Sequence, residues 1–233
     1  MSKKSEFRES RVTKLRFSYD ALAPIRELYH DFLSERLPDD VHIGIKAHED
    51  YSEEFKDVKM RWYFAKSQRA VDIFREVLDG CELHLVRSIV GDDLSKMRVV
   101  QANIIEIVGS YPEGRWHSDF TDEKLQLNQS ATLLTPLLDF KSHFGGLETT
   151  SVLRGESLDY DENATVHKYE AGEAILFDGT GTIHRTQSYK AAPDDKRVLV
   201  CWQFGEIDED MEPVFSRIGE KNGDPMFMHA HAD

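Results

Sequence analysis

The chain has 233 residues, of which 40% are hydrophobic and 31% are charged, as is typical of a globular domain with a substantial core. Its formal net charge of −14 disfavours nucleic acid as a partner, because an acidic surface repels a phosphate backbone. No apolar run approaches the roughly 20 residues of a membrane span, no apolar segment follows the basic start, and only two cysteines are present. We therefore expect a cytoplasmic protein that makes no use of membranes or disulfides.

The first third of the chain is predicted to be mainly helical. Residues 1–11 are polar and are expected to form a mobile tail. Apolar side chains recur at helical spacing over about 20–37, over 52–64, and from residue 67 to a glycine at position 80. The intervening residues 38–50 are expected to form a loop.

The rest of the chain has a sequence pattern typical of a β-protein, with short apolar runs separated by turns that contain glycine. The predicted strands lie at 81–86, 97–108, 131–140, 147–153, 165–169, 174–178, 183–184 and 196–204. Many short strands at close spacing favour an antiparallel sandwich or barrel over alternating βαβ units. The predicted fold is α+β and mainly β: a double-stranded β-helix (a cupin-like jelly roll) with helices packed outside.

Three regions follow from this division of the chain. Residues 1–80 are expected to form an N-terminal helical region packed on the core. Residues 81–210 would form the double-stranded β-helix, and residues 211–233 a C-terminal tail.

The stretch Trp116-His117-Ser118-Asp119 carries the strongest chemical signal. A histidine and a carboxylate two positions apart point to the same side of an extended backbone. One imidazole from a distant strand would complete a 2-His-1-carboxylate triad, which holds Fe(II) on one face and leaves positions open. His184 follows a strand and a glycine turn, and is the candidate third ligand. The remaining histidines are taken to be solvated or structural.

Five segments, in this order and spacing, resemble the Fe(II)/2-oxoglutarate-dependent dioxygenase superfamily, particularly its prolyl-hydroxylase-like branch. They are residues 116–119, 131–138 followed by 145–148, 171–177, 183–185 and 196–202, and the resemblance spans about 97–205. It implies that His117, Asp119 and His184 bind iron and form the catalytic centre. It also implies 2-oxoglutarate as cosubstrate, O2 as oxidant, ascorbate as a supporting reductant, and succinate and CO2 as co-products.

The far carboxylate of 2-oxoglutarate needs a fixed cation, for which Arg197 is favoured because a guanidinium grips a carboxylate with two hydrogen bonds. Its neighbour Lys196 is the rival, since strand alternation lets only one of the two face inward. Thr135 could supply a hydroxyl to the same carboxylate. Asn103 could touch the cosubstrate or the substrate.

The expected reaction is hydroxylation of an unactivated C–H bond in an amino acid, a small acid or a peptide side chain. Arg115, Arg154 and Arg185 flank the site and could hold a carboxylate or a peptide carbonyl. The N-terminal helices and residues 121–129 would form its walls or lid.

Two alternative functions stay open. One is a cupin-like metalloenzyme that does not use 2-oxoglutarate, and the other is a non-catalytic β-sandwich binding module. A halogenase is disfavoured, because halogenases of this superfamily have a small residue where this chain has Asp119.

Overall fold

The computed structural model describes residues 3–34, 41–44, 59–65, 67–81, 83–90, 97–112, 114–121, 124–127, 129–152 and 159–222. The helices are α1 (Lys3–Ser10), the short 3-10 helix η1 (Asp20–Leu22), α2 (Ala23–Leu33), α3 (Gln68–Cys81), α4 (Leu83–Val90) and α5 (Glu212–Asn222). The strands are β1 (Val12–Arg16), β2 (Val41–Gly44), β3 (Lys59–Ala65), β4 (Met97–Val108), β5 (Ser130–Pro136), β6 (Leu147–Thr150), β7 (Ala164–His167), β8 (Glu173–Asp178), β9 (Ile183–Thr186) and β10 (Lys196–Glu206).

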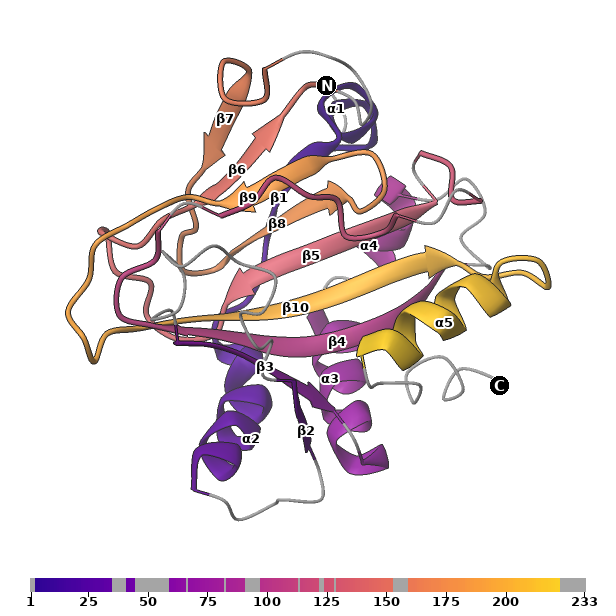
Figure 1. The fold of residues 1–233 in the computed structure, drawn as a ribbon. Helices are drawn as coiled ribbons and strands as arrows, with labels where there is room; N and C mark the ends of the chain where they lie inside the picture. The colour runs from indigo at the N-terminus through magenta and orange to yellow at the C-terminus, as the bar shows by residue number, and fades with distance from the viewer. Residues whose placement is uncertain are drawn as a thin grey trace.

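The strands form two antiparallel sheets that pack face to face (Figure 1). The main sheet has the order β1-β8-β5-β10-β4-β3-β2, and the small sheet the order β7-β6-β9. Two isolated bridges, Tyr111 with Tyr189 and His117 with His184, place the segment that contains Tyr111 and His117 beside β9 and the residues that follow it, as a further edge of the small sheet. Strands β4, β5, β8 and β10 thus oppose β6, β7, β9 and this segment, which is the arrangement of a double-stranded β-helix. The predicted jelly-roll fold is confirmed.

Side chains along β10 alternate between two faces of the main sheet. On the outer face, Val200 and Trp202 belong to the large core beneath the helices. On the inner face, Leu199 and Cys201 pack toward the small sheet. Residues paired across neighbouring strands point to the same face of the sheet. The register therefore assigns the residues of β4 and β5 to the outer or the inner face as well.

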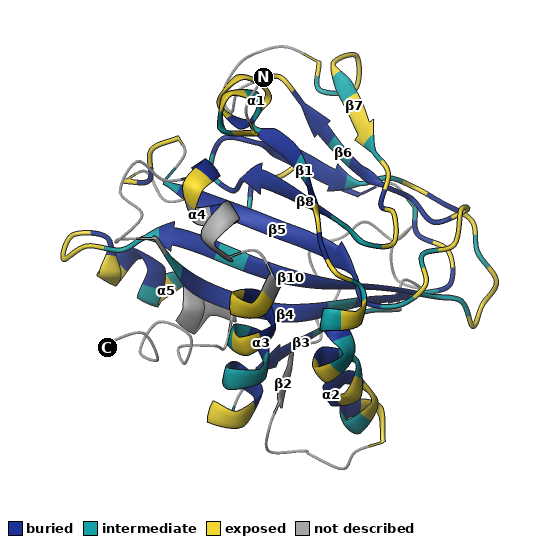
Figure 2. Cartoon of the chain, turned by 180° about the vertical axis from the view of Figure 1, so that it is seen from behind, coloured by how far each residue is buried: buried dark blue, intermediate teal, exposed yellow. Residues whose placement is uncertain are grey.

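Helices α1 to α4 cover the outer face (Figure 2). Each contributes wholly buried apolar side chains, including Phe7, Leu28, Phe74 and Val86. Burial of a side chain of this size contributes about 1.5–3 kcal/mol to folding, so this face accounts for much of the stability. Helix α5 packs elsewhere, with Phe215 in a cluster that includes Val100 and Phe120.

The structure corrects the predicted N-terminal tail. Residues 3–10 form α1, which is anchored by Phe7, and residues 12–16 form β1, which pairs with β8 at the sheet edge. The expected helix near 20–37 is present as η1 and α2, and ends at Leu33 in the described part of the chain. Within the expected loop 38–50, residues 41–44 form β2.

The helix predicted over 52–64 is wrong over its described part, because residues 59–65 form β3. Its side chains alternate, with Tyr63 in the outer core and Trp62 opposite the inner residue Ile105. The spacing of apolar residues that suggested a helix therefore matches a period of two as well. Since β1, β2 and β3 all join the main sheet, the first 80 residues are not solely a helical layer outside it.

Two further predicted segments, 81–86 and the tail after 211, have a different secondary structure, and buried side chains explain why. The strand predicted over 81–86 is instead the end of α3 and the start of α4, because Val86, Ile89 and Val90 meet the core at helical spacing. The predicted tail after 211 begins with α5, which Val214 and Phe215 anchor. The helix predicted from 67 and the strands predicted from 97 onward are present, with ends shifted by a few residues.

Candidate metal centre

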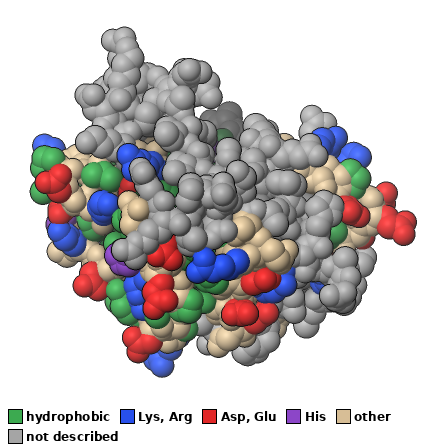
Figure 3. Space-filling model, turned by 90° about the horizontal axis from the view of Figure 1, so that it is seen from below, with side chains coloured by type: hydrophobic (Ala, Val, Ile, Leu, Met, Phe, Trp, Pro, Cys, Tyr) green, Lys and Arg blue, Asp and Glu red, His purple; other side chains and the backbone are tan. Residues whose placement is uncertain are grey.

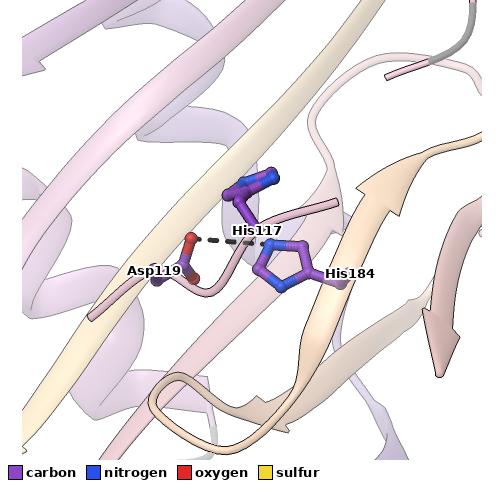
Figure 4. A group of neighbouring side chains, drawn as sticks. All are labelled: His117, Asp119 and His184. Carbon is purple, nitrogen blue, oxygen red and sulfur yellow. Dashed lines mark ion pairs between the residues drawn. The ribbon is translucent and has the colours of Figure 1, made fainter. Parts of the chain in front are cut away.

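The structure brings His117, Asp119 and His184 together (Figure 4). His117 and Asp119 lie on the segment between β4 and β5, and His184 lies on β9. The backbones of the two histidines exchange hydrogen bonds of 3.0 and 2.8 Å, so their side chains leave the sheet on the same side. One ligand atom from each of the three residues lies within 4.8 Å of the others. The predicted triad is therefore a spatial cluster built on paired backbone.

Both imidazoles are oriented by backbone carbonyls two residues before them. His117 Nδ1 lies 2.9 Å from the carbonyl oxygen of Arg115, and His184 Nδ1 lies 3.1 Å from that of Thr182. A carbonyl only accepts, so Nδ1–H donates and the lone pair of the neutral ring is on Nε2. This is the support that metal-ligating histidines commonly have.

Asp119 is held as an anion. Thr132 on β5 donates its hydroxyl to Asp119 Oδ2 at 2.5 Å, and Asp119 Oδ1 lies 3.5 Å from His184 Nε2. Burial alone would raise the pKa of Asp119, but the neighbouring histidines and the Thr132 hydrogen bond lower it to about 2. Conversely, burial would lower the pKa of His184, but the charge of Asp119 raises it above its ordinary value. Two imidazole nitrogens and one carboxylate on one face fit Fe(II) well.

The two histidines differ in their surroundings. His184 is buried, and the Phe177 ring packs at 4.5 Å from its ring. His117 is exposed. An ion held by this triad would therefore be enclosed on the His184 side and accessible on the His117 side.

Arg197 lies on the inner face of β10, where it is only 2% exposed. Its Nε donates to the carbonyl of Gly145 at 3.2 Å, and its guanidinium lies 5.3 Å from the Tyr169 ring centre. Gly145 must lack a side chain, because an added Cβ would collide with the backbone of Gln187. Among the described residues, no carboxylate pairs with Arg197. A buried guanidinium without a counter-ion is costly, so this position suits an anionic ligand.

Two tyrosines supply further donors beside Arg197. The hydroxyls of Tyr169 and Tyr189 are buried and have no hydrogen-bond partner in the described structure. Burial raises the pKa of Tyr189 to about 12 and raises that of Tyr169 as well, so both phenols keep their protons. Sequence analysis missed both residues, since neither lies in a motif that indicates anion binding.

The register separates Arg197 from its rival. Lys196 points to the outer face, where its Nζ lies 3.3 Å from Glu106 Oε2. Thr135 also lies on the outer face, opposite Val200, and donates its hydroxyl to the carbonyl of Glu173 at 2.9 Å. The predicted role of Thr135 at the cosubstrate carboxylate is therefore wrong, because the strand presents it to the opposite side of the sheet from Arg197.

The arginines expected to hold substrate have other environments. Arg185 is 7% exposed and pairs with Glu148 at 2.5 Å and with Asp161 at 2.6 Å. Its guanidinium also lies 4.2 Å from the Trp116 ring centre. Arg115 is exposed, and Arg154 lies outside the described residues. Arg185 thus braces the small sheet against the segment that bears His117, and its charge is already compensated.

Comparisons with known proteins show which solved structures share this fold. The sequence matches no protein-family model and no curated protein. Among solved structures, EctD from S. alaskensis is 18% identical with a TM-score of 0.63, over 88% of this chain and 77% of that one. The non-heme alpha-ketoglutarate-dependent carbocyclase SnoK from nogalamycin biosynthesis is 14% identical with a TM-score of 0.63, over 89% and 85%. A 2OG-Fe(II) oxygenase family protein from Burkholderia pseudomallei is 12% identical with a TM-score of 0.57, over 88% and 90%. The chain therefore has the jelly-roll fold of these proteins.

Proposed function

We propose that the chain is an Fe(II)- and 2-oxoglutarate-dependent dioxygenase that hydroxylates a C–H bond of an amino acid, a small acid or a peptide side chain. The observation that carries the proposal is that the His117–Asp119–His184 cluster lies on the same inner face as the buried Arg197, which has no carboxylate partner among the described residues. The first fits a ferrous ion, and the second fits the distal carboxylate of a keto acid that chelates this ion.

The spacing along β10 supports this assignment. Cys201 lies on the inner face close enough to Asp119 for that carboxylate, together with burial, to raise the pKa of its thiol. Arg197 is four residues away on the same face, about 13 Å along the strand at 3.3 Å per residue. The arginine side chain covers part of this distance, and a short dicarboxylate would cover the rest.

Each residue has a defined task in this proposal. His117, Asp119 and His184 would hold Fe(II), which when bound supplies the redox chemistry that activates O2 at the expense of 2-oxoglutarate. Thr132 donates to Asp119 Oδ2, so Oδ1 would be the oxygen offered to the ion. Arg197 would bind the distal carboxylate, with Tyr169 and Tyr189 as additional donors. The apolar inner-face residues Leu134, Ile175 and Leu199 exclude water from the space between the sheets.

The substrate is proposed to be a small molecule or peptide. On the described part of the underside, acidic and basic side chains are interspersed, with no broad basic area that would attract a polyanion (Figure 3). No helix in the described residues is long and apolar enough to cross a membrane.

The alternatives differ from this proposal in their use of the cosubstrate. A cupin-like metalloenzyme without 2-oxoglutarate would have no need of a buried, unpaired arginine, and a binding module would have no need of the oriented histidines. Purified protein should be incubated with Fe(II), ascorbate, O2 and 2-oxoglutarate, with and without pools of amino acids and peptides. We expect iron-dependent release of succinate and an increase of one oxygen atom in the mass of one pool component. Iron binding without any consumption of 2-oxoglutarate would favour the cupin-like alternative.

A further inference from the structure

The inner face carries a second set of buried polar atoms that the metal and 2-oxoglutarate sites do not use. Asn103 on β4 is 4% exposed, and its Oδ1 has no hydrogen-bond partner in the described structure. Gln203 on β10 likewise has a buried Oε1 without a partner. A buried carbonyl that makes no hydrogen bond is destabilising, and two of them on one face suggest a ligand that supplies the donors.

The register places both atoms beside the metal centre. Gln203 pairs with Thr132, the residue that donates to Asp119. Asn103 pairs with Cys201, which is buried on the same inner face of β10 two residues before Gln203. Asn103 and Gln203 are thus diagonal neighbours on adjacent strands, about 7–8 Å apart between backbones, and both side chains are long enough to converge on one group.

The neighbouring strand adds an aromatic surface. Phe64 on β3 pairs with Asn103, and Trp62 pairs with Ile105, so both rings belong to the inner face. Phe64 is buried at 7% exposure. Two carbonyl acceptors next to aromatic rings form a suitable environment for a cation, because the ring faces carry partial negative charge.

We propose that Asn103 and Gln203, with Phe64 and Trp62, bind a protonated amine of the substrate and so determine specificity. An ammonium group has three donors and no acceptor, so a single group can satisfy both carbonyls, whereas a hydroxyl can donate to only one. The inference rests on the proposed function. It narrows the substrate to an amine-bearing molecule, such as a free amino acid or a peptide with a lysine side chain.

The charges nearby are consistent with this choice. Arg185, which sequence analysis offered as a carboxylate ligand, is already paired with Glu148 and Asp161. Arg197 lies at the opposite end of β10. The basic residue nearest to Gln203 by register, Arg98, lies farther along β4 opposite Gly205, toward α5.

The test uses full-length protein with Fe(II), ascorbate and 2-oxoglutarate, and measures succinate formation. The probes are free L-amino acids and a lysine-containing peptide, each paired with the same compound acetylated on its amine. We expect a free-amine probe to raise succinate formation above the substrate-free rate, and its acetylated partner to fail. Equal stimulation by the acetylated partner, or stimulation only by carboxylic acids without an amine, would overturn the proposal.

Three variants separate recognition from folding. Asn103→Leu should raise the KM for the amine probe about tenfold or more, because a hydrogen bond to a charged group is lost. Gln203→Glu has nearly the same shape, and should lower this KM because it adds an opposite charge. Thr135→Val, on the outer face, is the matched control, and should change neither the KM for the amine probe nor the KM for 2-oxoglutarate. If Asn103→Leu and Gln203→Glu leave the KM for the amine unchanged, or alter only the KM for 2-oxoglutarate, the amine site is wrong.

Failure of the proposed function gives a different result. In that case, wild-type protein would show no iron-dependent 2-oxoglutarate consumption with or without any probe. Iron-dependent consumption that no amine probe stimulates would refute the amine site alone.

Discussion

The two faces of β10 are built for different purposes. On the outer face, two polar groups beside the strand are satisfied: Trp202 donates its indole N–H to the carbonyl of Phe74, and the buried carboxylate of Glu106 accepts from Tyr29 and Tyr63. On the inner face, neither the Arg197 guanidinium has a carboxylate partner nor Gln203 Oε1 a hydrogen-bond donor among the described residues. The same strand therefore packs into the hydrophobic core with one face, and with the other contributes polar groups that await a ligand.

This contrast indicates where stability and function lie. The apolar contacts beneath the helices favour folding strongly, and the unpaired inner groups oppose it until a ligand supplies their partners. Substitutions on the two faces should consequently separate stability from activity.

The largest effect is expected at the metal centre. Asp119→Ala removes the only anionic member of the cluster, so turnover should be abolished and Fe(II) occupancy should fall sharply. The melting temperature of the metal-free protein should change little, because few packing contacts are lost. Succinate release, iron content and thermal unfolding test this, with Asp72→Ala on α3 as a control. Near-normal activity of Asp119→Ala would refute the ligand assignment.

On the outer face, Trp202→Ala should lower the free energy of unfolding by about 3–5 kcal/mol, because it leaves a large cavity in the main core. Urea unfolding followed by circular dichroism would measure the change. The half-buried Trp62→Ala is a useful comparison, and should cost considerably less. A small loss for Trp202→Ala would mean that the outer face does not dominate stability.

The variant Arg197→Met should lose activity without losing stability. Loss of a charge-assisted contact of about 1.5–3 kcal/mol predicts an increase of roughly ten- to a hundredfold in the KM for 2-oxoglutarate. Without cosubstrate, the variant should be as stable as wild type or more stable, because a buried charge without a carboxylate partner has been replaced by an apolar side chain. Kinetics and urea unfolding of the same preparations test both statements. A strongly destabilised variant would show that Arg197 is mainly structural.

Iron binding should depend on pH through His184. The charge of Asp119 outweighs burial and raises the pKa of His184, and only the neutral imidazole can bind a metal. The apparent affinity for Fe(II) should therefore fall as the pH drops through this raised pKa. Asp119, with a pKa of about 2, stays ionised throughout this range. Anaerobic iron titrations at several pH values would measure the effect, and an affinity independent of pH would contradict it.

The smallest effect is expected for Lys196→Ala. The Lys196 side chain is partly exposed, and the buried Glu106 keeps Arg61 and the hydroxyls of two tyrosines as partners, so the loss of stability should be about 1 kcal/mol. The KM for 2-oxoglutarate should be unchanged, because the side chain leaves the sheet on the outer face. A large increase in this KM would mean that 2-oxoglutarate binds at the outer face of β10, and would contradict the proposed role of Arg197.

Sequence reasoning was most successful where local pattern decides the structure. The strands from residue 97 onward were predicted because the pattern of apolar runs and turns is local. The His117–Asp119–His184 cluster was predicted from the His-x-Asp spacing and from the order of the segments that resemble the dioxygenase superfamily, although His184 is distant in sequence. Sequence reasoning favoured Arg197 over Lys196, but strand register was needed to show which of the two side chains lies on the inner face. The same limitation explains the error at Thr135.

Long-range packing accounts for the other errors. Strand β3 was predicted as a helix because its apolar residues fit both periods, and its pairing with β4 decides between them. Tyr169 and Tyr189 lie outside β10 and approach Arg197 only through the packing of the chain, so no local pattern could have assigned them to its surroundings.

The most direct test of the central claim, that the inner face holds Fe(II) and 2-oxoglutarate together, is anaerobic visible spectroscopy. A keto acid that chelates Fe(II) gives a charge-transfer absorption, which should appear when 2-oxoglutarate is added to wild-type protein loaded with Fe(II). The same band should require much more 2-oxoglutarate in Arg197→Met, the wild-type amount in Lys196→Ala, and should be absent in Asp119→Ala. Wild-type protein that binds iron but shows no such band with 2-oxoglutarate, or an Arg197→Met titration identical to wild type, would contradict the account.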